Sequence, residues 1–535
     1  VDGSEPLPDP RSPSQPGGVH GPSMTVDHSA FRWTDSGWQA RPLSSAVIYE
    51  LHVGTFTPEG TFDAAIQRLD HLTDLGVTHV EVMPVNSFSG EWGWGYDGVS
   101  LFAPHKAYGG VEGLKRFVNA CHERGLAALL DVVYNHFGPS GNYTGKFGPY
   151  TTNAHHTPWG PAVNLDGPYS FEVRRFICDN ALMWLRDYHF DGLRLDAVHA
   201  LIDASATHIL EQLSTEVDTY ERESGRHLAL IAESDLNDPR IVRSQEAGGY
   251  GIDAQWSDDF HHALHSLLTG EQLGYYSDFG RFADLAKAIE NIFVHDGSFS
   301  GYRNRPHGRS AAGIPPDRFV VCAQNHDQVG NRAAGERLSH LISPGRLRIA
   351  AGLTFLSPCI PMIFQGEEWG ASSPFQYFTN HQEDWLAEAV SEGRKSEFRA
   401  FGWQPEQVPD PQCRETFERS KLDWSEIGRP EHRSLLDWHH RLIQLRGPLT
   451  GMAGNLRPRV EFDDEECWMA VYWGPAVFCF SLAAKSVRIA AGAPDSVILA
   501  SSCECVRFEH GVVQLMPDTC ALIGPALNET AGDYR

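Results

Sequence analysis

Three acidic side chains stand at or just beyond the ends of short apolar stretches. Asp196 follows the run GLRL, Glu233 follows the run LALIA, and Asp327 comes shortly after RFVVCAQN. Carboxyl groups gathered without a metal-binding pattern suit glycoside hydrolysis, in which one carboxylate attacks the anomeric carbon while a carboxylic acid protonates the leaving oxygen. These three acids are therefore the candidate catalytic residues.

The neighbours of each acid suggest a different protonation state and a different role. Arg194 lies two residues before Asp196, and a nearby cation favours the ionised carboxylate that a nucleophile needs. Glu233 follows an apolar strand, so desolvation should raise its pKa and let it hold a proton near neutral pH. Asp327 is expected to stabilise the oxocarbenium-like transition state. The alternative for Arg194 and Asp196 is a buried ion pair with a structural role alone.

Several polar and aromatic residues are candidates for sugar binding. The aromatic rings of EWGWGYDG (91–98) suit stacking on pyranose rings, although they could also hold a loop together. His136 and His326 are expected to donate hydrogen bonds to the same sugar as Asp327 binds. Asp259 suits either a sugar contact or a helix cap. The full set of substrate-binding candidates is Tyr96, Asp97, His136, Arg194, His199, Asp259 and His326.

Other polar residues at the same strand ends could have purely structural roles. Asp131 and Asn135 are expected to brace the site rather than to touch substrate. His261 and His262 suit packing as well as they suit sugar binding.

These residues can share one surface only if a particular succession of elements positions them. Apolar runs of strand length alternate with amphipathic segments such as 62–76, 111–125 and 172–189, which is typical of parallel βα units. The predicted strands are 46–53, 79–85, 126–133, 192–198, 228–233, 252–258, 318–325 and 361–368. Eight strands with intervening helices predict an α/β fold, a (β/α)8 TIM barrel with its active site at the carboxyl ends of the strands. A doubly wound sheet is the runner-up, but no G-x-G-x-x-G motif follows the first strand.

The sequence pattern divides the chain into three parts. Residues 1–45 are expected to form a linker, because residues 1–30 are dense in Pro, Gly and Ser and should be extended. Residues 46–450 are predicted to form the barrel, with a long loop insertion after strand 3, at 134–171, passing over its mouth. Residues 451–535 contain short β-like runs and are expected to form an antiparallel, β-sandwich-like C-terminal domain.

Composition limits the partners and the compartment. The 43 Lys and Arg against 69 Asp and Glu give a net charge of −26, which disfavours nucleic acid and anionic membrane surfaces. No apolar run is long enough to span a bilayer. Ten cysteines are scattered without zinc spacing, which predicts buried reduced thiols and a cytoplasmic protein. We expect an oligosaccharide substrate, with no nucleic-acid or membrane partner, no metal and no cofactor.

Short segments of the chain carry a resemblance to a known family. In order, they resemble the signature regions of the α-amylase family of retaining glycoside hydrolases: DVVYNH (131–136), GLRLDAVH (192–199), AES (232–234) and NHDQ (325–328), with VNLD (163–166) similar to a fifth region. Four such regions together are highly specific, and the match extends over the barrel.

The resemblance implies roles for individual residues. Asp196 takes the position of the nucleophile, Glu233 that of the acid/base, and Asp327 that of the transition-state stabiliser. Tyr96 takes the position of the tyrosine that stacks on the sugar in the −1 subsite.

Longer segments are similar to one branch of that family, the maltooligosyltrehalose trehalohydrolases. They are DVVYNHFGPSGNY, WSDDFHHALHSLLTGEQLGYY, NHDQVGNRAAGERL and FQYFTNH. This resemblance implies hydrolysis of the α-1,4 bond next to the terminal trehalose unit of maltooligosyl trehalose, which releases trehalose. Many α-amylases have Lys and His where this chain has His199 and Ala200, so the leaving-group side is built differently. The stretch DPRSPSQPGGVHGPS (9–23) resembles the segment that follows the N-terminal β domain of this family, so residues 1–45 would be a linker and remnant of a domain that is missing here.

Other functions stay open at the level of sequence. A glucan branching enzyme, or another α-1,4-glucan enzyme on the same barrel, would use the same acids but could pass the glycosyl group to a sugar hydroxyl. A non-catalytic glucan-binding homologue would be expected to have lost one acid, yet all three are present. A metal-dependent hydrolase would need His136 or His326 as metal ligands.

Overall fold

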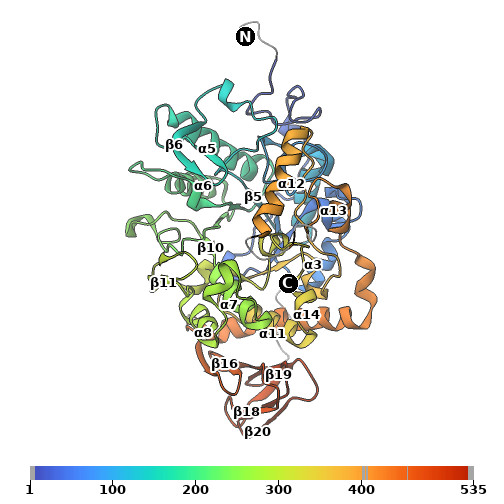
Figure 1. The fold of residues 1–535 in the computed structure, drawn as a ribbon, viewed down its shortest axis with the longest axis vertical. Coiled ribbons are helices and arrows are strands. Elements are labelled where there is room, and N and C mark those ends of the chain that lie inside the picture. Colours follow the sequence, from blue (N-terminus) through green and yellow to red (C-terminus); the bar gives the residue numbers. More distant parts are fainter. Residues whose placement is uncertain (1–5, 400–403, 405–407, 455, 528–535) are drawn as a thin grey trace.

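The centre of the molecule is a closed barrel of parallel strands. The computed structural model describes residues 6–399, 404, 408–454 and 456–527 (Figure 1). The barrel strands are, in spatial order, β1 (Ile48–Leu51), β14 (Ile360–Phe364), β13 (Phe319–Cys322), β10 (Ala254–Trp256), β9 (Ala229–Ala232), β8 (Gly192–Leu195), β5 (Ala127–Val132) and β2 (His79–Val82). All eight predicted strands are present, so the prediction of an eight-stranded parallel barrel is confirmed.

Helices surround the barrel, and most of them return the chain between successive strands. The principal ones are α2 (Phe62–Ile66), α3 (Leu69–Leu75), α4 (Gly110–Glu123), α5 (Ser170–Asp187), α6 (Ile209–Ser224), α7 (Asp258–Thr269), α8 (Phe282–Asn291), α11 (Pro344–Phe355) and α14 (Pro430–Ala453). Shorter or peripheral helices are α1 (Val53–Phe56), α9 (His326–Gly330), α10 (Leu338–Leu341), α12 (Asp384–Arg399) and α13 (Arg414–Arg419). The predicted helix 62–76 is two helices, because the chain leaves the helical path at Gln67 and Arg68.

The inner face of the barrel changes from apolar to charged toward the carboxyl ends of the strands. Ile48, Leu129 and Ile231 belong to an apolar cluster inside the barrel. Two residues further along the same strands stand Glu50, Asp131 and Glu233. Side chains two apart on a strand share a face, so these acidic residues stack directly above the apolar layer. The sequence thereby concentrates charge at one end of the barrel.

The segment 134–171 is less irregular than predicted. It contains the hairpin β6 (Thr151–Thr157) and β7 (Gly160–Val163), which lies beside α5 in Figure 1. Most β6 side chains are exposed or half-buried, so the strand has no apolar alternation that would reveal it in the sequence. Other short strands form two further pairs: β3 (Asn86–Ser87) with β4 (Ser100–Pro104), and β11 (Phe299–Ser300) with β12 (Arg305–Pro306).

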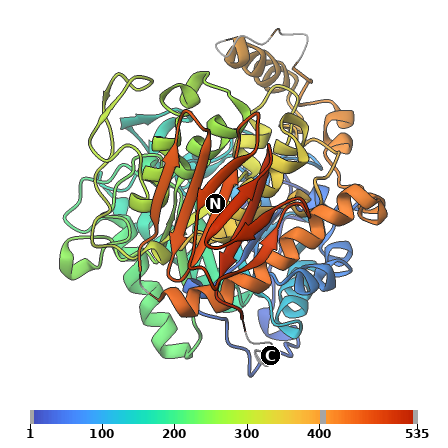
Figure 2. The same cartoon turned by 90° about the horizontal axis from the view of Figure 1, so that it is seen from below.

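The C-terminal strands form two antiparallel sheets. One contains β15 (Arg459–Asp463), β16 (Trp468–Trp473), β17 (Ala476–Ser481), β22 (Thr519–Gly524) and β19 (Val497–Ser501); the other contains β18 (Val487–Ala490), β21 (Val512–Leu515) and β20 (Arg507–Glu509). Figure 2 shows them as a layer across the barrel helices. Phe478 and Leu522 belong to the same core cluster as Ile349 of α11, so this layer shares its core with the barrel.

The N-terminal segment runs along the barrel without long elements. Only the short 3-10 turns His28–Ala30 and Leu43–Ser45 occur in the part of it that is described. Trp38 Nε1 donates to Asp191 at 2.9 Å, and the Asp35 carboxylate bonds His122 at 2.9 Å. These contacts attach the segment to the barrel wall.

The cysteines differ in part from the prediction of buried reduced thiols. Cys503 and Cys505 are joined by a disulfide, while the other eight are free. Of the free thiols, Cys413 is exposed and Cys467 is half-buried. Within the described residues, no helix has both the length and the apolar character needed to cross a bilayer.

Candidate active site

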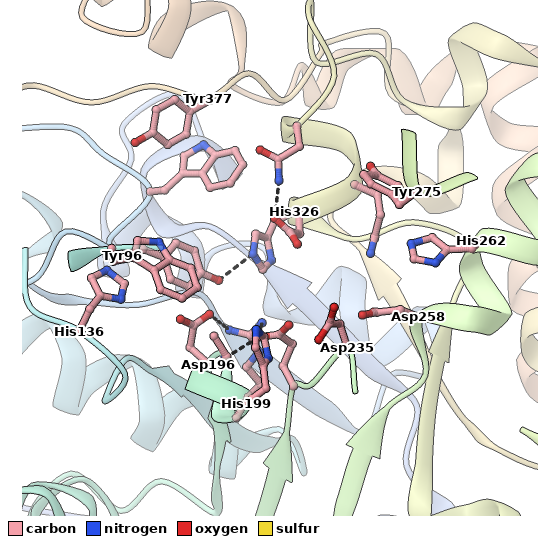
Figure 3. A pocket seen from close by; sticks show the side chains of 18 of the residues that line it. Tyr96, His136, Asp196, His199, Asp235, Asp258, His262, Tyr275, His326 and Tyr377 are labelled. Carbon is pink, nitrogen blue, oxygen red and sulfur yellow. Dashed lines mark hydrogen bonds and ion pairs between the residues drawn. The ribbon is translucent and has the colours of Figure 1, made fainter. Parts of the chain in front are cut away.

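A cavity of about 560 Å³ opens at the carboxyl ends of the barrel strands (Figure 3). It is lined by Asp196, Glu233 and Asp327, which come from three different strand ends. Every predicted substrate-binding residue also lines it, with the exception of Asp259. The convergence expected from the strand order is thus present.

Arg194 joins the carboxyl groups of the site. Its side chain is 2% exposed, and its Nη1 donates to both carboxylate oxygens of Asp131, at 2.8 and 2.7 Å, and to Asp196 Oδ1 at 2.8 Å. Its Nη2 lies 3.5 Å from Glu233 Oε2. Asn135 Nδ2 donates to Asp196 Oδ2 at 2.6 Å. Both oxygens of Asp196 are therefore held, and the bracing expected of Asp131 and Asn135 is what their contacts provide.

The turn after Asp196 connects the first acid to the second. Ala197 has φ 41° and ψ 50°, which lies in the left-handed region that residues other than glycine seldom adopt. In this conformation its backbone N–H donates to Glu233 Oε2 at 2.5 Å. A strained residue persists only where its surroundings hold it, and such positions concentrate at functional sites.

Glu233 is the acid whose environment most favours the protonated form. Burial raises the pKa of Glu233 well above its usual value, while Arg194 opposes the shift and the carboxylates of Asp196, Asp258 and Asp327 add to it. The side chain still has 15% of its surface exposed, toward the cavity that it lines. A protonated carboxyl with access to the cavity can serve as a general acid.

A chain of hydrogen bonds fixes Tyr96 beneath the cavity. The Tyr96 hydroxyl donates to Asp131 at 2.6 Å and lies 2.8 Å from His326 Nε2. His326 Nδ1 is 2.5 Å from Glu50 Oε1. Although burial lowers the pKa of His326, the Glu50 carboxylate overrides this and the pKa is raised, which favours the form with a proton on both ring nitrogens. Both nitrogens of His326 thus already have protein partners.

His136 lies on the same side of the cavity as Tyr96 (Figure 3). Its Nδ1 lies 2.5 Å from Asn135 Oδ1, and its ring stacks on Trp159 with 5.1 Å between centroids and 6° between planes. Burial lowers the pKa of His136, which favours the neutral ring. Trp159 comes from the turn between β6 and β7 and is 48% exposed. The excursion after strand 3 therefore delivers an aromatic ring to the cavity.

The segment 91–98 serves both of the purposes considered for it. Trp94, Tyr96 and Asp97 line the cavity. Trp92 instead stacks on Phe417, with centroids 5.9 Å apart and planes 10° apart, and is absent from the cavity lining. The first part of the segment thus holds a loop in place, while the second part presents rings to the site.

Asp259 requires a correction, because it does not line the cavity. Its carboxylate accepts from the backbone N–H groups of Val294 and His295, at 2.7 and 2.9 Å, and from Asn237 Nδ2 at 2.9 Å. It braces a neighbouring loop and does not cap its own helix. The adjacent Asp258 occupies the cavity wall. Consecutive residues of a helix point in different directions, and sequence alone did not show which of the two faced the site.

The paired histidines after strand 6 have separate positions. His261 is buried, with Nδ1 2.8 Å from the Ala323 carbonyl oxygen and Nε2 2.9 Å from the Tyr276 hydroxyl. His262 lines the cavity. His261 therefore packs inside the protein, whereas His262 belongs to the wall of the cavity.

Several lining residues were not found from the sequence. They are Trp159, Asp235, Asp258, Tyr275, Tyr302, Arg303, Gln328, Asn331 and Tyr377. Asp235 could have been found, because it stands two residues after Glu233 and an extended chain returns to the same face at that spacing. Most of the others lie on loops without a local pattern. In the described parts of the chain, no group of three or more His, Cys, Asp or Glu side chains is arranged to hold a metal ion.

A closed parallel barrel with this carboxyl-lined cavity at its mouth defines a glycoside hydrolase with the α-amylase fold. A family model described as the alpha-amylase catalytic domain matches residues 28–155. A crystal structure of a Salmonella typhimurium protein, provisionally described as an alpha amylase, superposes with a TM-score of 0.88 at 39% identity, covering 97% of this chain and 88% of that one.

Curated relatives identify the branch of the family more narrowly. The malto-oligosyltrehalose trehalohydrolase of Arthrobacter ramosus is 54% identical over 491 residues, which is 92% of this chain and 84% of the relative. The malto-oligosyltrehalose trehalohydrolase of Rhizobium sp. (strain M-11) is 50% identical over 528 residues, which is 98% of this chain and 88% of the relative. A 1,4-alpha-glucan branching enzyme of Vibrio parahaemolyticus matches at 32% identity but covers only 45% of this chain and 36% of that protein. The chain belongs to the malto-oligosyltrehalose trehalohydrolase family.

Proposed function

We propose that this enzyme hydrolyses the α-1,4-glucosidic bond adjacent to the terminal trehalose unit of maltooligosyl trehalose, with retention of configuration, and releases trehalose. One observation carries the proposal: Arg194 contacts both Asp196 and Glu233 and so holds the two acids close together. The chain that carries this pair belongs to the trehalohydrolase family.

The two carboxyl groups divide the reaction between them. In the first step Asp196 attacks the anomeric carbon, the bond to the leaving oxygen breaks, and Glu233 gives its proton to that oxygen. In the second step Glu233, now a carboxylate, takes a proton from water, and the oxygen of that water displaces Asp196 from the anomeric carbon. Asp327 faces the cavity and offers negative charge to the oxocarbenium-like sugar.

The nearest alternative is transfer to a sugar hydroxyl, as in a branching enzyme. Both reactions share the first step and differ only in the acceptor that enters in the second. The extent and identity of the match to trehalohydrolases, against the partial match to a branching enzyme, favour water.

Product analysis tests the proposal. The enzyme is incubated separately with maltotriosyl trehalose and with maltopentaose, which contain the same number of glucose units, and the sugars are separated by chromatography. Trehalose from the first, with little cleavage of the second, is expected. Equal cleavage of both, or new branched products, would contradict it.

We also propose the cytoplasm as the compartment and exclude nucleic acid as a partner. Eight free cysteines fit a reducing environment, and a net charge of −26 repels polyanions.

A further inference from the structure

The cavity has a second cluster of polar side chains on the side away from Asp196. In Figure 3, Asp196, Tyr96 and His136 lie on one side, whereas Asp235, Asp258, His262 and Tyr275 lie on the other. The reacting sugar sits against Asp196, and Glu233 protonates the oxygen that leaves. Glu233 Oε2 accepts from the backbone N–H of Ala197, next to Asp196, and the Asp258 carboxylate is near enough to raise the pKa of Glu233. Residues on the Asp258 side of the cavity are therefore placed to face the leaving sugar.

Substrate discrimination has to come from this far side. Maltotriosyl trehalose and maltopentaose present the same α-1,4-linked glucose units to the Asp196 side of the cavity. They differ only in the departing disaccharide, which is linked α,α-1,1 in trehalose and α-1,4 in maltose. A residue that separates the two substrates must therefore contact the leaving group.

Asp258 differs from the other acids of the cavity in its lack of protein partners. It is the first residue of α7 and lines the cavity, and in the described part of the chain no hydrogen bond or ion pair involves its carboxyl group. Asp131 and Asp196, by contrast, are held by Arg194, and Asp327 accepts from Asn331 Nδ2 at 2.6 Å. The Asp258 carboxyl is half-buried, lines the cavity and has no protein partner among the described residues, so it is available to bind a ligand there.

Asp235 is the second carboxyl group on this side of the cavity and lies next to Asp258. Its carboxylate faces that of Asp258 in Figure 3 and accepts from Arg303 Nη2 at 3.2 Å. Burial raises the pKa of Asp258 to about 7, and the nearby Asp327 and Asp235 carboxylates add to the shift. An acid and a carboxylate side by side offer a donor and acceptors together, which is what sugar hydroxyls require.

We propose that Asp258, paired with Asp235, is a specificity-determining residue that binds hydroxyl groups of the departing trehalose. This inference rests on the proposed function, because it assumes that trehalose is the leaving group.

The test uses Asp258→Ala and the nearly isosteric Asp258→Asn. Asp296→Asn is the matched control, since Asp296 pairs with Lys287 outside the cavity lining. The value of kcat/KM is measured on maltotriosyl trehalose, on maltopentaose and on α-maltotriosyl fluoride, whose leaving group reaches no sugar-binding residue. Inhibition of fluoride hydrolysis by free trehalose gives the affinity of the leaving-group side directly.

In Asp258→Ala, we expect the preference for maltotriosyl trehalose over maltopentaose to fall about tenfold or more, and the inhibition constant of trehalose to rise by a similar factor. Asp258→Asn should show a smaller change, because the amide keeps both a donor and an acceptor. Hydrolysis of the fluoride and the control variant should stay near wild-type rates.

Two results would overturn the inference. An unchanged preference and an unchanged trehalose inhibition constant in Asp258→Ala would show that the carboxyl does not bind the leaving group. Loss of fluoride hydrolysis in both folded variants would assign Asp258 to the chemical step instead. Failure of the proposed function is a separate result, because it is seen in the wild type as absence of preference for the trehalose-ended substrate.

Discussion

At the scale of single residues, the site depends on a cation placed between acids. Arg194 contacts Asp131, Asp196 and Glu233 from a position that is almost fully buried. One guanidinium thus orients the proposed nucleophile and stands beside the proposed acid. Its rigid, planar arrangement of donors suits several carboxylates at once, which a lysine ammonium cannot match.

The roles of the two acids predict the effect of removing either. Asp196→Ala should abolish turnover, and Glu233→Gln should lower kcat by about 10²–10⁴-fold, the range that general acid catalysis supplies. Rates on maltotriosyl trehalose, with circular dichroism to establish folding, provide the measurement. Asp437→Asn, on the exposed face of α14, is the control and should keep wild-type activity. A folded Asp196→Ala or Glu233→Gln enzyme with wild-type rates would show that the roles are misassigned.

The raised pKa of Glu233 predicts the alkaline side of the pH profile. The acid must be protonated to act, so kcat/KM should fall as the pH rises through that pKa, which lies well above the usual value for a glutamate. In Glu233→Gln this alkaline fall should disappear from the residual activity, because an amide does not titrate. The measurement is kcat/KM against pH for both proteins. An identical alkaline fall in the variant would assign it to another group.

At the scale of elements, short turns between strand and helix position the acids. Asn325 caps α9 by accepting from the backbone N–H of Asp327 and Gln328. Gly330 lies at the other end of this helix, where a Cβ atom would come 2.0 Å from Trp94 Cζ2. The helix that carries Asp327 is therefore packed directly against an aromatic ring of the cavity.

This packing predicts that Gly330→Ala displaces α9 or Trp94. We expect a loss of stability of about 1–3 kcal/mol from overpacking, together with a lower kcat. Thermal unfolding and turnover are the measurements. Gly393→Ala in α12 is the matched control, because its Cβ would meet nothing within 4 Å and alanine favours a helix. Equal melting temperatures for the two variants would contradict the account.

The barrel and its three acids were predictable because both leave strong local patterns. Apolar runs of four to eight residues revealed all eight strands. The three acids stand at or just beyond the ends of such runs, and in a parallel barrel these ends meet at one rim. The hairpin that brings Trp159 was missed because β6 has no buried face and β7 is only four residues long. Asp259 was chosen over Asp258 because side-chain direction at a helix start depends on the tertiary fold. Tyr302, Arg303 and Tyr377 lie in turns and loops whose paths no sequence period encodes.

At the scale of the whole molecule, the barrel and the C-terminal sheet are joined by a common core. Phe480 of β17 is fully buried and stacks on Phe282 of α8, with ring centroids 6.1 Å apart. Phe462 of β15 meets the same ring, at 6.3 Å, but is 36% exposed. The sheet therefore contributes to the stability of the barrel although it lies away from the cavity lining.

This common core predicts that damage to the sheet also weakens the barrel. Phe480→Ala should lower the free energy of unfolding by about 3–5 kcal/mol, the usual range for a buried phenylalanine. Phe462→Ala should cost less. Denaturant titration is followed both by tryptophan fluorescence and by residual activity, and the two curves should coincide. Activity that survives the unfolding of the sheet would show that the barrel is independently stable.

The central claim is that Asp196 forms a covalent bond to the reacting sugar while Glu233 supplies the proton. The most direct measurement is to incubate Glu233→Gln with α-maltotriosyl fluoride, which needs no acid to leave, and to identify the labelled peptide by mass spectrometry. The account predicts a maltotriosyl adduct on the peptide that contains Asp196, at the side chain of that residue. An adduct on another carboxyl group, or rapid hydrolysis to the inverted anomer with no adduct, would contradict it.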